Sequence, residues 1–493
     1  MVRRLLGQAL FFYLVLSTLG TILRIKLVFP LFPKLPYNNV LHAHSHIAFL
    51  GWINVALIAL MIFFTFPNQG ASISSLKFFI GSLWVVNIGL VLSFLAQAYG
   101  PVSITFSTLS VVLSVWFLFL YFRHGRSSNI SPLAKRFLST GVIFYVASAI
   151  GLVMVALSMA AKIGGRGLFN AGVYFYLHSQ YNGWMVFALI GTMLAASDRL
   201  HELHADQHVG QQINQHTGRH VNQYIKQQDD QPIGQHVKQH VGHHVVQHTD
   251  QTKQVKTTRE RRLGLSWLLL TLGFLPSYIP QISFLDLPAW LNIIGILGTF
   301  SALAGILLFI SEVTRSFRRS ITQPALRLLF LYIMAALIVK FTLEAAGAFP
   351  MVAFMIQTNR PVIIGYLHLT LLVIFSSYIF FALYQYGFIR RCSNRPFKAF
   401  SRSRLQNQVQ TYQSYSHPDA TSAASEGSMT RFFMITYMIL TFTMVFLLFV
   451  WGLWFWLGLT VNMYAINTVL AVISAVLSVL GFIPWYALRQ SNN

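Results

Sequence analysis

Residues 431–457 read RFFMITYMILTFTMVFLLFVWGLWFWL, and Arg431 is the one charged residue among them. A helix rises about 1.5 Å per residue, so such a stretch can cross a hydrocarbon core about 30 Å thick. Comparable stretches along the chain predict an all-α fold, a polytopic membrane helical bundle of about 12 transmembrane helices. The other eleven are 5–29, 40–66, 76–98, 101–123, 136–161, 171–197, 263–281, 288–311, 326–348, 361–387 and 464–488.

The composition excludes a water-exposed globular surface. Of the 493 residues, 55% are hydrophobic and 10% are charged, whereas soluble domains contain about 25% charged residues. The net charge of +23 lies mostly in loops, where it indicates orientation in a lipid bilayer and not binding of nucleic acid. The single cysteine, Cys392, excludes an internal disulfide.

Lys and Arg concentrate in alternate connecting segments. These segments are Arg3/Arg4, Lys77, 123–136, 199–262, 315–327 and 390–431. The intervening loops at 99–100, 282–287 and 458–463 carry no Lys or Arg, whereas the 24–39 loop carries three. Because cytoplasmic loops are enriched in Lys and Arg, the balance predicts a multi-pass protein of the inner (cytoplasmic) cell membrane with both termini in the cytoplasm.

The chain divides into five segments. Residues 1–197 hold predicted spans 1 to 6, 198–262 a cytoplasmic low-complexity loop rich in His and Gln, 263–387 spans 7 to 10, 388–430 a basic cytoplasmic loop, and 431–493 spans 11 and 12 with a short tail.

The 207–254 part of the first loop repeats every four residues, as in QHVK and QHVG. If this repeat is helical, His236, His240, His244 and His248 would stack on one face and could collect a divalent metal. The simpler interpretation, an expanded insert without a fold of its own, is favoured.

Histidines recur near one level of the predicted bundle. Spans 2, 6 and 10 are expected to run in the same direction, and each begins near an asparagine suited to capping, Asn39, Asn170 or Asn359. Counted from these asparagines, His46, His178 and His368 lie seven, eight and nine residues into their spans, about 10–14 Å below the outer end.

Polar groups in a bilayer are costly and indicate function. Two imidazoles from separate helices are typical axial ligands of a haem in a helical bundle, although copper could use the same residues. The clustered histidines therefore predict a metal or haem site.

Further polar side chains lie close to these histidines in the sequence. Tyr181 and Asn182 follow His178 and are possible supports of a site there. Lys340 and Glu344 are four residues apart, so they share a helix face and could pair with each other. The alternative is that they hold a haem propionate or pass protons.

The LHAHSHIAFLGW stretch (41–52) and the histidines of spans 6 and 10 resemble subunit I of the haem–copper oxidase superfamily. The likeness is nearest to cbb-type oxidases, nitric-oxide reductases and NnrS-like haem- and copper-binding proteins. It implies a cytochrome oxidase subunit I-like fold with a haem b held by one histidine from span 2 and one from span 10. His368 is then the span 10 ligand. On span 2 we expect His46, which shares a face with His42, and next His44.

The departures from the family pattern are specific. Tyr366 stands where the active oxidases carry the ligand of a high-spin haem, and span 7 (LGLSWLLLTLGFLPSYIP) contains no histidine to join His178 in a copper site. The resemblance therefore implies a degenerate relative that lacks the full copper site. A second metal, copper or iron, stays open at His178.

The expected function is that of a membrane b-type haem protein in electron transfer or in the handling of NO or O2, an atypical oxidoreductase. No CxxCH motif is present, so electrons would come from a redox partner protein or a quinol. One alternative is a histidine-box di-iron enzyme, because His42 and His46 have the required spacing. The other is a cofactor-free transporter lined by Asn182, Lys340 and Glu344.

Overall fold

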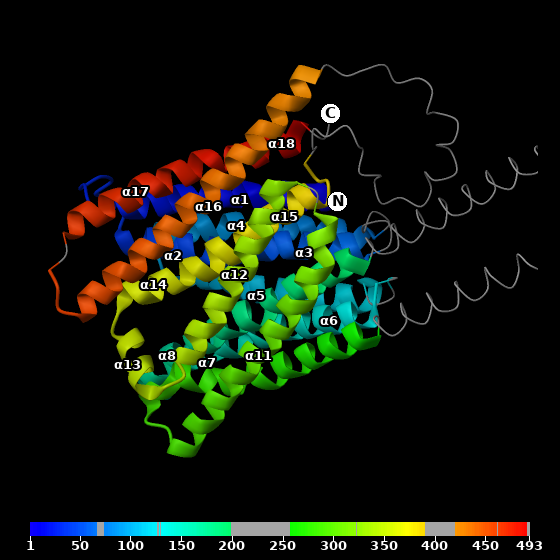
Figure 1. The fold of residues 1–493 in the computed structure, drawn as a ribbon. Helices are drawn as coiled ribbons and strands as arrows, with labels where there is room; N and C mark the ends of the chain where they lie inside the picture. Colours follow the sequence, from blue (N-terminus) through cyan, green and yellow to red (C-terminus); the bar gives the residue numbers. More distant parts are fainter. Residues whose placement is uncertain are drawn as a thin grey trace, which may run out of the picture.

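The computed structural model describes residues 1–66, 73–125, 128, 130–198, 257–321, 323–389, 420–460 and 462–490. All regular structure in these residues is helical, and the helices pack side by side in one bundle (Figure 1). Eleven helices in this part of the chain are long and apolar enough to cross a membrane. The predicted helical membrane bundle is confirmed at this level.

The first half of the bundle contains α1 (Val2–Lys26), α2 (Tyr37–Ile47), η1 (Ala48–Ile53), α3 (Asn54–Thr65), α4 (Ser74–Gln97), α5 (Pro101–Leu120), η3 (Tyr121–Gly125), α6 (Pro132–Ala147), α7 (Ala149–Ala160), α8 (Gly165–His178), η4 (Ser179–Met185) and a helix over 186–198. The second half contains a helix over 257–274, η5 (Pro276–Leu285), α11 (Ala289–Ser320), α12 (Pro324–Ala346), α13 (Pro350–Gln357), α14 (Arg360–His368), η6 (Leu369–Ser376), α15 (Ser377–Gln385), α16 (Ala420–Trp456), α17 (Met463–Leu480) and α18 (Phe482–Gln490).

Predicted span 6 differs from the other eleven. Residues 165–198 form a continuous helix that contains the predicted span 171–197, yet this helix is not among the eleven apolar ones. Its middle carries the polar run HSQYN (178–182), which lowers its hydropathy. A helix shielded from lipid by its neighbours can carry such a run, and residues 178–196 are buried.

The predicted asparagine caps are correct for one span of three. Asn359 precedes α14 and accepts a hydrogen bond from the Val362 amide at 3.3 Å. Span 2 begins earlier, at Tyr37, so Asn39 lies in its first turn and donates to the Leu95 carbonyl at 2.9 Å. Asn170 lies inside α8.

Each of the three histidine-bearing spans changes from α-helix to π-helix close to its histidine. The π-helical segments are η1, η4 and η6, which follow His46, His178 and His368 within two residues. Such wide turns are uncommon and occur frequently at functional sites. Spans 2, 6 and 10 therefore share a local irregularity at the level where a site was predicted.

Direct side-chain hydrogen bonds join these three spans. The indole of Trp52 in η1 donates to the Ser376 hydroxyl in η6 at 2.8 Å. The indole of Trp184 in η4 donates to the Asn54 side-chain oxygen in α3 at 2.7 Å. All four residues are buried. Spans 2, 6 and 10 thus contact one another through buried side chains.

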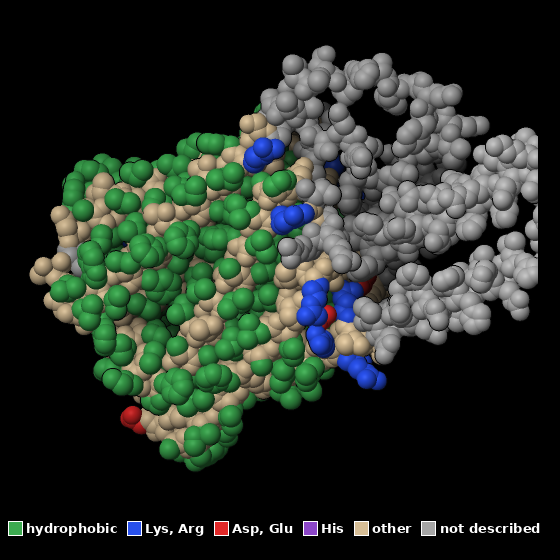
Figure 2. All heavy atoms as spheres, viewed as in Figure 1, with side chains coloured by type: hydrophobic (Ala, Val, Ile, Leu, Met, Phe, Trp, Pro, Cys, Tyr) green, Lys and Arg blue, Asp and Glu red, His purple; other side chains and the backbone are tan. Residues whose placement is uncertain are grey.

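The beginning of α1 and the end of α18 lie at the same end of the bundle (Figure 1). Figure 2 shows an apolar lateral surface, with Lys and Arg side chains near that same end. This arrangement fits an even number of crossings. The predicted loops at 198–262 and 388–430, including His236, His240, His244 and His248, lie largely outside the described residues.

Candidate functional site

His44 of α2 and His368 of α14 have the same hydrogen-bonding state. His44 Nδ1 lies 3.0 Å from the Leu16 carbonyl of α1, and His368 Nδ1 lies 2.8 Å from the Ile364 carbonyl of its own helix. A neutral imidazole that donates through Nδ1 has its lone pair on Nε2. Within the described ranges neither Nε2 has a hydrogen-bond partner, so both rings have a free ligating nitrogen.

The two imidazoles belong to one neighbourhood. They are close enough to interact electrostatically with each other and with the Arg24 guanidinium near the end of α1. Arg24 also donates to the Asn467 side-chain oxygen of α17 at 3.3 Å. Both histidines are half-buried. Two free imidazole nitrogens and a cation are thus gathered between spans 1, 2, 10 and 12.

Close contact with α1 positions His44. A side-chain carbon added at Gly20 would lie 3.0 Å from His44 Cε1. The glycine therefore lets the imidazole approach the backbone of α1, where Leu16 accepts its hydrogen bond. A carbonyl that fixes the tautomer and orientation of a ring is the usual outer partner of a metal-ligating histidine.

His46, the expected span 2 ligand, packs against α4. The His46 ring stacks on Phe94 of α4, with centroids 4.2 Å apart and planes at 17°, and its Nε2 lies 3.4 Å from the Tyr99 hydroxyl. His42 shares this face as predicted, because its ring lies 4.4 Å from that of Tyr99. Residues two apart on a helix point about 200° apart, so His44 turns toward α1 and His368.

His178 does not present a free nitrogen. It is fully buried (0% exposed). Its Nε2 lies 2.8 Å from the Phe274 carbonyl, and its Nδ1 lies 2.9 Å from Gln281 Nε2 and 3.1 Å from Asn182 Nδ2. Among the described residues, no three His, Cys, Asp or Glu side chains gather as a metal site. Hydrogen bonds thus engage both ring nitrogens of His178, the residue at which the sequence left a second metal open.

The predicted pairing of Lys340 with Glu344 is confirmed. Lys340 is fully buried, and its Nζ lies 3.0 Å from Glu344 Oε1. Nζ also donates to the Asn182 side-chain oxygen. The same Glu344 oxygen accepts from Asn182 Nδ2 at 2.8 Å and from the Tyr366 hydroxyl. We call Asn182, Lys340, Glu344 and Tyr366 the polar cluster; it joins spans 6, 9 and 10.

Aromatic rings enclose the polar cluster. Lys340 Nζ lies 4.0 Å from the ring centroid of Phe341 and 5.7 Å from that of Tyr181. The Tyr181 ring packs edge-on against Tyr366, with centroids 5.9 Å apart. Because Lys340 and Glu344 carry opposite charges, the cluster as a whole has no net charge.

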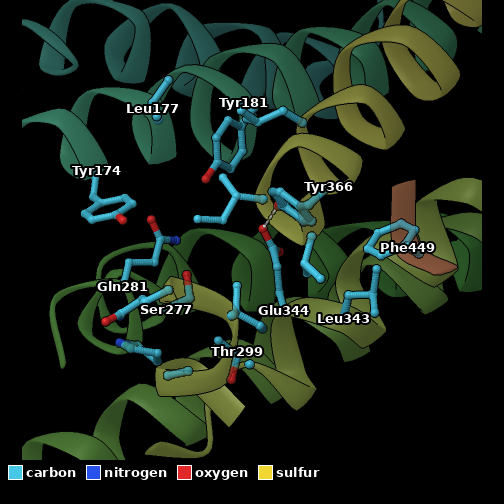
Figure 3. Close-up of a pocket in the computed structure, with 18 residues that line it drawn as sticks. Tyr174, Leu177, Tyr181, Ser277, Gln281, Thr299, Leu343, Glu344, Tyr366 and Phe449 are labelled. Carbon is cyan, nitrogen blue, oxygen red and sulfur yellow. Dashed lines mark hydrogen bonds between the residues drawn. The ribbon is translucent and has the colours of Figure 1, made fainter. Parts of the chain in front are cut away.

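A cavity of about 180 Å³ lies beside the polar cluster (Figure 3). Its wall is mainly apolar and comes from eight helical elements. The lining residues are Tyr174, Leu177, Tyr181, Ser277, Pro280, Gln281, Thr299, Leu343, Glu344, Gly347, Ala353, Ile356, Gln357, Val362, Ile363, Tyr366, Leu367 and Phe449. His44 and His368 are not among them, so the cavity and the histidine pair are two separate features of the molecule.

No protein-family model matches the chain, and no curated protein is significantly similar to it. The resemblance to haem–copper oxidase subunit I therefore depends on the motifs of spans 2, 6 and 10 alone.

Proposed function

We propose that this protein is an integral membrane haem protein in which His44 and His368 would hold one b-type haem. The proposal depends on the identical hydrogen bonding of the two imidazoles. Each ring donates through Nδ1 to a backbone carbonyl and has an unpartnered Nε2, and each lies within electrostatic reach of the other. His178, which has both ring nitrogens engaged, and His46, which packs on Phe94, lack this combination.

The side chains around the pair fit such a ligand. The Leu16 and Ile364 carbonyls hold the two rings in orientation. Arg24, within electrostatic reach of both rings, would supply a positive charge for the carboxylates of a porphyrin. When bound, a haem with two imidazole ligands supplies one-electron redox chemistry without an open position for a gas. We therefore favour electron transfer over NO or O2 handling, in an atypical oxidoreductase on a subunit I-like scaffold.

Haem analysis of the purified protein tests this function. We expect about one b-type haem per chain, since two imidazoles hold one iron, with α and Soret bands that sharpen on reduction. Protein purified from haem-replete cells without any haem would contradict the proposal.

We further propose that the protein lies in the inner cell membrane with both termini in the cytoplasm, as the loop charges indicate. Cys392, the single cysteine, falls in the basic segment predicted to be cytoplasmic. A membrane-impermeant maleimide should therefore label it only after spheroplasts are opened. Labelling of Cys392 in intact spheroplasts would show the opposite orientation and contradict this proposal.

A further inference from the structure

One oxygen of the Glu344 carboxylate has no partner. The three donors of the polar cluster, from Asn182, Lys340 and Tyr366, all converge on Oε1. Within the described part of the chain, Oε2 accepts no hydrogen bond, and Glu344 lines the cavity. The cavity therefore contains a carboxylate acceptor that a ligand with a hydrogen-bond donor can satisfy.

The charge of the cluster decides what kind of donor fits. Lys340 is fully buried and compensates Glu344 at 3.0 Å. A cationic ligand would add an uncompensated positive charge to a buried site, which costs free energy. A neutral hydroxyl can donate to the free oxygen without that cost. The site thus favours a neutral ligand that carries at least one hydroxyl.

The size and walls of the cavity favour a single ring. Its volume of about 180 Å³ is below the roughly 300–1,000 Å³ of pockets for drug-sized ligands. Most of the lining is apolar or aromatic. Figure 3 shows Tyr174 and Gln281 across the cavity from Glu344 and Tyr366. A ring with a hydroxyl at each end would therefore meet polar groups on both sides.

The short helix α13, which connects spans 9 and 10, forms part of the cavity wall. Ala353 of the short helix α13 lines the cavity and is buried, whereas Met351 and Phe354 on the same helix are 77% and 69% exposed. α13 lies between predicted spans 9 and 10, so these exposed apolar side chains lie at the end of the bundle where those two spans are connected. Most of the cavity wall belongs to helices long and apolar enough to cross a membrane, so we expect its ligand to reach it from the bilayer.

We propose that this cavity binds the ring of a lipid-soluble hydroquinone, with one ring hydroxyl donating to Glu344 Oε2. The oxidised quinone has carbonyl oxygens in place of both hydroxyls, so it cannot donate to the carboxylate and would place an acceptor against an acceptor. The site should therefore distinguish the reduced ring from the oxidised one. A role of this ligand as the electron donor depends on the proposed function, whereas its binding does not.

Calorimetric titration of the full-length protein in detergent, under anaerobic conditions, tests the proposal. The probes are tetramethylhydroquinone, the matching quinone and the hydroquinone dimethyl ether, which keeps the ring but has no donor. We expect the hydroquinone to bind at least about tenfold more tightly than either control, as a hydrogen bond to a charged acceptor predicts. Equal affinities for the hydroquinone and the quinone would overturn the proposal.

Variants locate the binding site. Glu344→Gln should lower the affinity for the hydroquinone to the affinity for the quinone. Since this change touches the buried Lys340, Ala353→Phe provides a second test: it places a ring at the cavity wall and should abolish binding, while Met351→Phe on the outward face should not change it. Unchanged binding in Ala353→Phe would overturn the site.

The histidine pair separates this proposal from the haem proposal. His368→Ala should lose haem and keep its affinity for the hydroquinone, because His368 does not line the cavity. A protein that contains haem but binds the hydroquinone and the quinone equally would contradict only the proposed cavity ligand. A protein that prefers the hydroquinone but contains no haem would contradict only the proposed haem function.

Discussion

Replacing His44 or His368 with alanine is expected to remove haem from the purified protein, whereas His46→Ala is expected to retain it. The first two imidazoles have a free Nε2 and lie near each other, and the third packs on Phe94. Loss of an outer partner of a metal ligand commonly costs about 10–100-fold in affinity, so loss of a ligand should cost at least as much.

Haem content per chain, measured on variants purified at equal yield, checks this prediction. His46→Ala is the matched control, since it removes a neighbouring histidine of the same span, with a ring stack worth about 0.5–1.5 kcal/mol and the 3.4 Å contact to the Tyr99 hydroxyl. His178→Ala should also retain haem, although it breaks the contacts to Phe274 and Gln281. If His46→Ala loses haem and His44→Ala retains it, the span 2 ligand is His46 and the proposed assignment to His44 is wrong.

Glu344→Ala is expected to have the largest effect on stability. It leaves the fully buried Lys340 without its counter-charge, and breaking a buried ion pair in this way costs about 3–5 kcal/mol. Replacing both partners by apolar residues, as in Lys340→Met with Glu344→Leu, should recover much of that loss because no charge then remains buried.

Thermal unfolding in detergent, followed by tryptophan fluorescence, measures this effect. Glu312→Ala is the control, since Glu312 pairs with Arg262 and Arg315 at 3.0 and 3.3 Å, and these arginines are 47% and 68% exposed. Exposed partners remain hydrated, so we expect a loss of at most about 1 kcal/mol. Equal losses in the two single variants, or a double variant as unstable as Glu344→Ala, would contradict the prediction.

Hydropathy predicted the architecture because a bilayer leaves few choices for the backbone. Every peptide group inside the hydrocarbon must be paired within the protein, so long apolar stretches become helices. The helix over 165–198 shows the limit of that signal. Its HSQYN run is polar because spans 2 and 10 lie beside it, with contacts such as Trp184 to Asn54, and hydropathy alone does not contain this information.

The choice between His44 and His46 needed the neighbouring helices. Sequence spacing shows that the two side chains point in different directions, but not which of them faces span 10. That depends on the packing of α2 between α1 and α4, where Gly20 admits His44 and Phe94 covers His46. Arg24 belongs to the 24–39 segment, whose three basic residues depart from the charge pattern of the other loops. In the structure it lies near the end of α1, within electrostatic reach of His44 and His368.

The cavity could not be predicted from the sequence. Tyr174, Gln281, Ala353 and Tyr366 come from four elements, and nothing in their local sequence indicates that they share one space. Lys340 and Glu344 were singled out by their helical spacing, yet their contact with Asn182 joins residues more than 150 positions apart. Long-range packing of this kind is fixed by the whole bundle.

Low-temperature electron paramagnetic resonance of the oxidised, purified protein reads the iron coordination directly. If His44 and His368 hold the iron, the spectrum will show a low-spin ferric centre, and His44→Ala or His368→Ala will abolish that signal or convert it to high spin. A low-spin signal that survives in both alanine variants, or no ferric haem signal in the parent protein, would contradict the account.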